Sequence, residues 1–173
     1  MAEPTQASAL RFAPELEARF QKMLPHYPVR SAVLIPTLHL ALKQWGHLSD
    51  EVVTFVAEKV GVAPSEVLGV ISFYTMLHRE PLGKYNIQVC QTLSCALAGA
   101  EGLVEHLEKK LGIKVGETTP DGLFSLSTAE CLASCGTAPV IQVNVEELDE
   151  NLTFERVDQV IERCRKDAQA GGK

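Results

Sequence analysis

In the first half of the chain, apolar residues recur every three or four positions, the spacing that places them on one face of a helix. This pattern predicts a series of helices at residues 14–24, 34–45 and 49–60, and a fourth that begins at Pro64. Ser49 is a good N-cap, and Gly46 and Gly61 are typical helix ends. We expect Pro36 to start or kink the second helix. The first half is therefore predicted to be a helical bundle.

The pattern changes at residues 81–84, where Pro-Leu-Gly-Lys is followed by a short run of β-forming residues. From there we expect strand, helix, strand, strand, a weak fourth strand and a last helix, at residues 85–89, 99–111, 123–128, 140–145, 148–152 and 153–165. A β-α-β unit followed by β-β-α is the order of the thioredoxin core, a small sheet with helices on its faces. The predicted fold class is therefore α/β (α+β), with a helical arm before a thioredoxin-like domain.

These patterns divide the chain into four segments. We expect a flexible N-terminus at residues 1–12, the helical arm at 13–80, the thioredoxin-like domain at 81–166 and a flexible tail at 167–173.

Composition and charge exclude several classes of function. The 173 residues carry a formal net charge of -6, so there is no basic surface to attract phosphate backbones, and we expect no nucleic-acid partner. No apolar run approaches the roughly 20 residues that cross a bilayer, and residues 1–10 lack the pattern of a signal peptide. We therefore expect a cytoplasmic protein without direct membrane insertion, in which cysteines serve as ligands or catalysts more often than as disulfide partners.

The most informative residues are two close pairs of cysteines, Cys90 with Cys95 and Cys131 with Cys135. Each pair follows an expected strand. If those two strands are parallel neighbours, as a right-handed β-α-β unit requires, both loops leave the sheet at the same end. Four sulfurs could then bind one metal centre. The fifth cysteine, Cys164, lies on the apolar face of the last helix, and we expect it to be a buried structural residue.

Four thiolates suit a 2Fe-2S cluster or a structural zinc ion, and the C-x4-C and C-x3-C spacings do not fully separate the two. The loops favour the cluster, because they are rich in small residues that leave backbone N–H groups free to donate to an anionic group. Thr92, Ser94, Ser134 and Thr137 could also donate to the sulfurs, or could simply bind local backbone. The five histidines share no metal-ligand spacing with the cysteines. Phe73, Tyr74, Met76 and Leu77, beside the domain boundary, are interpreted as core between the arm and the following domain and not as a partner-binding surface.

The two loops read Cys90-Gln-Thr-Leu-Ser-Cys95 and Glu130-Cys131-Leu-Ala-Ser-Cys135-Gly-Thr-Ala-Pro139. Together with Phe73-Tyr74-Thr75-Met76, Pro81-Leu82-Gly83-Lys84-Tyr85, Asp121-Gly122 and Phe124, they extend over nearly all of the chain. On these residues the chain resembles the thioredoxin-like 2Fe-2S ferredoxin subunit of the NADH dehydrogenase module of respiratory complex I. One departure is Ala133, which lies where many relatives have glycine, so the second loop is expected to be less flexible.

The resemblance implies that Cys90, Cys95, Cys131 and Cys135 bind one 2Fe-2S cluster and that the arm at residues 13–80 docks on a partner subunit. That partner, not this chain, would bind FMN and NADH, since the chain has no glycine-rich phosphate loop or flavin fingerprint. The isolated chain would be an electron carrier without a substrate site, exchanging single electrons with the FMN. Through the flavin subunit it would contact the other peripheral-arm iron-sulfur subunits, on the cytoplasmic side of the inner membrane.

Two alternatives remain open from the sequence. The same kind of subunit resembles those of soluble NAD-linked hydrogenases and formate dehydrogenases, which would change the assembly but not the chemistry. The second alternative is a zinc-stabilised interaction module with no redox role.

Overall fold

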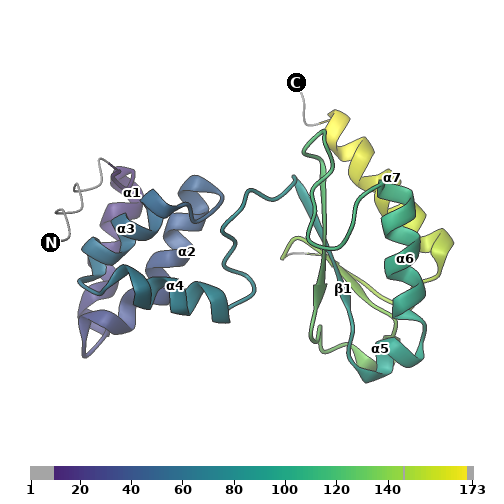
Figure 1. Ribbon diagram of the computed structural model, residues 1–173, viewed down its shortest axis with the longest axis horizontal. Helices are drawn as coiled ribbons and strands as arrows, with labels where there is room; N and C mark the ends of the chain where they lie inside the picture. The colour runs from purple at the N-terminus through teal and green to yellow at the C-terminus, as the bar shows by residue number, and fades with distance from the viewer. Residues whose placement is uncertain (1–9, 146, 171–173) are drawn as a thin grey trace, which may run out of the picture. The chain divides into compact units, whose positions relative to one another are not determined.

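The computed structural model describes residues 10–145 and 147–170, and the chain divides into two compact units, Met1–Pro81 and Leu82–Lys173 (Figure 1). The predicted flexible residues 1–9 and 171–173 lie outside the described part. Phe12, which falls in the segment expected to be flexible, is instead buried against Trp45 and Phe55, with ring centroids 5.5 and 5.0 Å away. The core of the first unit therefore begins before the first helix.

The first unit contains the four expected helices: α1 (Pro14–Met23), α2 (Leu34–Trp45), α3 (Asp50–Val60) and α4 (Pro64–Phe73). Two 3-10 turns, η1 (Leu24–His26) and η2 (Arg30–Val33), connect α1 to α2. Ser49 caps α3 by accepting the Val52 N–H at 3.4 Å, as expected from a serine at that position. Gly46 and Gly61 end their helices with φ of 74° and 80°.

Pro36 is the third residue of α2 and does not end the helix. The first turn of a helix has no intrahelical partner for its N–H groups, so a residue without an N–H is tolerated there. Residues 73–77 are not the buried cluster that the sequence suggested. Leu77 is 4% exposed, but the Phe73 and Met76 side chains are 76% and 56% exposed. Tyr74 is exposed as well, at 37%, so the interpretation of these four residues as core is wrong for all but Leu77.

The second unit is built on a four-stranded sheet in the order β2-β1-β3-β4. Its strands are β1 (Tyr85–Cys90), β2 (Phe124–Ala129), β3 (Ile141–Val143) and β4 (Glu147–Asp149), and its helices are α5 (Leu93–Leu97), α6 (Ala100–Leu111) and α7 (Phe154–Ala170). β1 and β2 pair in parallel over their whole length, while β3 is antiparallel to both β1 and β4. The predicted thioredoxin-like order and the parallel β-α-β unit are confirmed.

Both long helices, α6 and α7, lie on one face of this sheet (Figure 1) and share one core with it. Ile87 and Val89 of β1 and Leu126 of β2 point into that core and are fully buried. The positions between them are polar, for example Gln88 and Ser127, as expected when only one face of a sheet is covered by helices. The expected sheet with covering helices is present, with both long helices on the same face.

Three elements end two or more residues away from their predicted ends. β3 stops at Val143 because Asn144 turns the chain with a φ of 55°. β4 begins and ends earlier than residues 148–152, since Asn151 has a φ of 50° that no strand accommodates. The last helix continues past Arg165 to Ala170, so the first part of the expected flexible tail is helical. Within the described residues, no helix is long and apolar enough to span a membrane.

Candidate functional site

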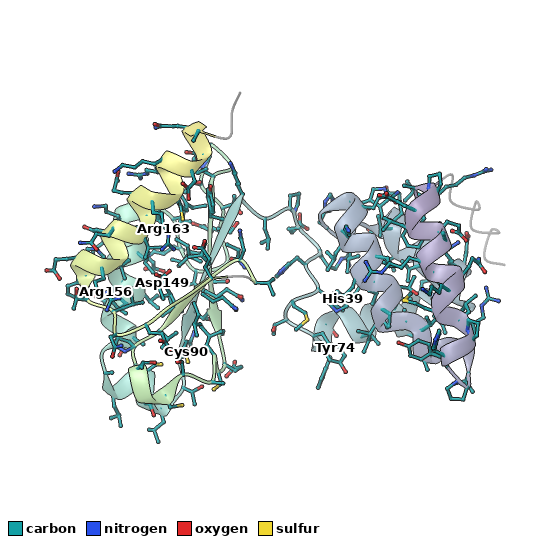
Figure 2. The ribbon with its side chains drawn as sticks, turned by 180° about the vertical axis from the view of Figure 1, so that it is seen from behind. His39, Tyr74, Cys90, Asp149, Arg156 and Arg163 are labelled. Carbon is teal, nitrogen blue, oxygen red and sulfur yellow. The ribbon has the colours of Figure 1, made fainter. Side chains whose placement is uncertain are left out.

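The two cysteine loops leave the sheet at the same end. Cys90 is the last residue of β1 (Figure 2), and the parallel register places it opposite Ala129, the last residue of β2. Cys131 follows two residues later. The Gln91 N–H donates to the Ala129 carbonyl at 3.0 Å and so continues the pairing into the loops. The two cysteine loops therefore lie at the same end of the sheet, as predicted.

Cys95 and Cys135 lie on two short helical turns that contact each other. Cys95 is in α5, a helix the sequence analysis missed, and Cys135 begins the 3-10 turn η3 (Cys135–Thr137). α5 packs against η3. Thr92 immediately before α5 is a helix-start signal that could have predicted it, but the segment is too short for apolar periodicity to appear.

Backbone N–H groups of both loops are directed at the sulfurs. Burial raises the pKa of the Cys90 thiol, but hydrogen bonds from the Leu132 and Thr92 N–H groups act against burial and the pKa is lowered. Leu132 belongs to the second loop, so this contact joins the two loops at a sulfur. Within the second loop, the Ala133 N–H donates to Cys131 Sγ at 3.3 Å. The site is therefore suited to thiolates and to an anionic group bound to them.

Cys95 carries the second sulfur of the first loop, and the pKa of its thiol is raised. Burial raises the pKa of the Cys95 thiol, and the Cys90 sulfur and the Cys135 charge raise it further. Cys90 and Cys95 are 3% and 2% exposed, whereas Cys131 and Cys135 are exposed. The candidate site is thus buried on the first-loop side and open to solvent on the second-loop side.

The four hydroxyls near the cysteines divide into separate roles. Thr92 donates a side-chain hydrogen bond to the Cys90 sulfur. Ser94 lies in α5, where its carbonyl accepts the Ala98 N–H at 3.0 Å. Ser134 and Thr137 bind the carboxylate of Glu150 and not a sulfur. Nothing in the sequence indicated Glu150, because it lies outside both cysteine motifs.

Four cysteine sulfurs can bind either a single zinc ion or a binuclear iron-sulfur cluster. One zinc ion would need four ligands at about 2.3 Å from a single point. Throughout the described ranges, no three Cys, His, Asp or Glu side chains are grouped closely enough to hold one metal ion. A 2Fe-2S cluster instead shares four cysteines between two irons.

The other residues considered from the sequence lie away from this site. Cys164 is 2% exposed in the core beneath α7, as predicted, and burial raises the pKa of its thiol. His106 Nε2 of α6 lies 2.8 Å from Asp158 Oδ1 of α7, and the carboxylate is the acceptor. That contact connects two helices and has no part in the cysteine site.

Comparison with known proteins identifies relatives over most of the chain. One relative is an NADH-quinone oxidoreductase subunit of Rhizobium meliloti, 45% identical over 139 residues, which are 80% of this chain and 82% of the relative. Another is NADH-quinone oxidoreductase subunit 2 of Thermus thermophilus, 47% identical over 150 residues, which are 87% and 82% of the two chains.

Among solved structures, a chain of the NAD+-reducing [NiFe]-hydrogenase in the air-oxidized state superposes with a TM-score of 0.67 at 23% identity. The match covers 78% of this chain and 23% of the hydrogenase chain, and it shows a shared fold. The family model for the thioredoxin-like [2Fe-2S] ferredoxin matches residues 20–165. An iron-sulfur cluster is the cofactor of that family, and the resemblance in the sequence is confirmed. The chain belongs to the thioredoxin-like [2Fe-2S] ferredoxin family.

Proposed function

We propose that this chain is the 2Fe-2S electron-transfer subunit of an NADH:quinone oxidoreductase. In this proposal Cys90, Cys95, Cys131 and Cys135 are the cluster ligands. The observation that carries it is the convergence of the two cysteine loops, where the Leu132 N–H of the second loop lowers the pKa of Cys90 in the first. When bound, the cluster would supply a site that accepts and releases single electrons.

The protein's own residues would prepare and shield this site. N–H donors from Thr92 and Leu132 favour the thiolate form of Cys90, the form that binds iron. Cys90 and Cys95 are buried and would bind the side of the cluster that faces the protein interior. Cys131 and Cys135 are exposed and would bind the side that faces solvent. Electron transfer to a partner requires such an open side, because the rate falls as protein is placed between the centres.

The proposed partner is a subunit that binds FMN and oxidises NADH. The relatives that support this assembly are named as NADH-quinone oxidoreductase subunits and are 45% and 47% identical to the chain. We assign partner docking to the helical arm at residues 13–80, and contact with the other iron-sulfur subunits to the flavin subunit. The complex would place this chain at the cytoplasmic side of the inner membrane, peripheral to the bilayer.

The ligand assignment is tested by two serine variants of the full chain. Cys131→Ser removes one of the four sulfurs, and we expect it to lose most of the visible absorbance of an oxidised 2Fe-2S cluster. Cys164→Ser is the matched control, because Cys164 is a buried residue of α7 and is not one of the four proposed ligands, and its spectrum should be unchanged. Wild-type absorbance in Cys131→Ser would overturn the ligand set.

The assembly is tested by affinity purification of the chain from its native cells. A flavin-binding subunit together with quinone-reducing membrane subunits is the expected result. The solved hydrogenase with the same fold suggests the alternative outcome. Copurification with a hydrogenase or a molybdenum-containing formate dehydrogenase would assign the chain to a soluble NAD-linked enzyme and contradict the proposed assembly.

A further inference from the structure

Three polar side chains form a hydrogen-bonded cluster around the turn that carries Cys135. Thr137 Oγ1 donates to Glu150 Oε1 at 2.7 Å, and Ser134 Oγ donates to the same oxygen. The two hydroxyl oxygens lie 2.8 Å apart. Each hydroxyl has one proton, and a carboxylate is the strongest acceptor in reach, so neither proton is left for a cysteine sulfur. Glu150 thus holds the residue before Cys135 and the residue two positions after it.

The two residues that flank Glu150 in the chain, Asp149 and Asn151, are both held by α7; Figure 2 labels Asp149 together with Arg156 and Arg163 of that helix. Arg163 of α7 donates to Asp149 Oδ2 at 2.9 Å, and Arg156 of the same helix donates to the Asn151 carbonyl at 3.1 Å. The Asn151 N–H in turn donates to the Thr137 carbonyl at 2.7 Å. The residues on both sides of Glu150 are therefore held by hydrogen bonds from α7, which fixes the point from which its carboxylate extends.

The second loop needs such support more than the first. Residues 130–134 form no helix or strand, and Ala133 has a φ of 58°. Cys95 of the first loop is held within α5, but Cys135 begins a turn of only three residues and is exposed. Fixing both flanks of Cys135 removes most of the freedom of its backbone, so the sulfur would be held near the position that binding requires.

The cluster of three side chains also holds a charge. Hydrogen bonds from Ser134 and then Thr137 lower the pKa of Glu150, so the carboxylate is ionised at neutral pH. In the part of the chain that the structure describes, no Lys, Arg or His forms an ion pair with it. Reduction adds a further electron to an already anionic cluster, and an uncompensated negative charge nearby makes that step less favourable.

We infer that Glu150 is a positioning residue of the cluster site, fixing Ser134 and Thr137 on both sides of Cys135 and holding a negative charge that keeps the reduction potential of the cluster low. The inference rests on the proposed function, since it requires a cluster between the two loops. Glu150 would then be a residue outside the cysteine motifs that affects both how long the cluster is retained and its reduction potential.

The test uses the full-length chain with its cluster and three variants. Glu150→Ala removes the acceptor and the charge, whereas Glu150→Gln keeps an acceptor oxygen and removes only the charge. Glu105→Gln is the control, because it removes an exposed carboxylate of α6 that pairs with Lys109 at 3.6 Å and contacts none of these residues. The readouts are the rate at which visible absorbance is lost in excess chelator and the midpoint of a redox titration. Far-UV circular dichroism establishes that each variant is folded.

We expect Glu150→Ala to lose its cluster roughly tenfold faster than wild type, about the effect of one hydrogen bond to a charged group. Glu150→Gln should lose it at a rate much closer to wild type. Both variants should have a more positive midpoint, and the control should match wild type in both readouts. A purely structural role of Glu150 would leave the midpoint of Glu150→Gln unchanged.

The inference is overturned if Glu150→Ala retains its cluster as long as wild type, or if Glu150→Gln has the wild-type midpoint. The wild-type sample separates the two proposals. A wild-type chain without a 2Fe-2S spectrum would contradict the proposed function and this inference together. A normal wild-type spectrum with unaltered variants would contradict only the role of Glu150.

Discussion

Ala133, two residues after Cys131, has a left-handed backbone with a φ of 58°. A side chain beyond hydrogen costs about 1 kcal/mol or more in this region, and glycine avoids that cost. The sequence already marked this position as a departure from the pattern that the family resemblance implies. The structure gives the reason, which is conformation at a tight turn and not flexibility as such.

We therefore expect Ala133→Gly to raise the free energy of unfolding by up to about 1 kcal/mol. This net value allows for the greater conformational entropy that glycine gives to the unfolded chain, which opposes the gain. The control is Ala138→Gly in the same loop, where φ is -63° and glycine brings no relief. That control should lose stability. Urea denaturation of both variants measures the difference, and equal losses would show that Ala133 is not strained.

At the scale of elements, Gly83 explains part of the Pro81-Leu82-Gly83-Lys84-Tyr85 motif that precedes β1. A Cβ at this position would lie 2.7 Å from the Phe124 carbonyl carbon and 3.0 Å from that of Leu123, both backbone atoms of the neighbouring chain segment. The Gly83 N–H also donates to Ser125 Oγ at 2.7 Å. Close backbone approach therefore requires glycine where the first strand enters the sheet.

Gly83→Ala should lower the free energy of unfolding by about 1–3 kcal/mol, the usual cost of overpacking. Gly102→Ala in α6 is the matched control in the same unit, since its Cβ would meet only the Phe154 ring at 3.6 Å. Alanine in a helix interior should stabilise the control by about 0.5–1 kcal/mol. If thermal unfolding shifts the two variants in the same direction, the steric account of Gly83 is wrong.

The contact between α6 and α7 makes a prediction about pH. Asp158 of α7 lies 2.8 Å from His106 Nε2 and accepts from Lys110 Nζ at 3.0 Å, and these hydrogen bonds lower the pKa of Asp158. A carboxyl with a lowered folded-state pKa contributes stability above its unfolded pKa of about 3.9, and loses that contribution as pH falls through the folded pKa.

Asp158→Asn should therefore cost at most about 1 kcal/mol at neutral pH, because the side chain is partly exposed. Denaturation of the apoprotein should show this gap closing as the pH is lowered below about 4. Glu105→Gln, which removes an exposed ion pair with Lys109, should show almost no gap at either pH. A gap for Asp158→Asn that stays constant with pH would contradict the assigned role.

Across the whole molecule, the features that could be predicted from the sequence are those that depend on residues close together in the chain. Helix caps such as Ser49 and Gly61 and the strand beginning at Tyr85 depend on neighbouring residues, and they were predicted within a few positions. The cysteine pairs were predicted to converge because a helical crossover between two neighbouring strands makes them parallel, and parallel strands end at the same end of the sheet. Glu150 could not be predicted, because its contact with Ser134 depends on how the connection after β4 folds back.

The measurement that tests the central claim most directly is the iron, zinc and acid-labile sulfide content of the purified full-length chain. Cys90, Cys95, Cys131 and Cys135 are predicted to hold one 2Fe-2S cluster, so iron and acid-labile sulfide should be present in a one-to-one ratio, at roughly two of each per chain, with little zinc. A colourless protein that contains zinc and no labile sulfide would contradict the account.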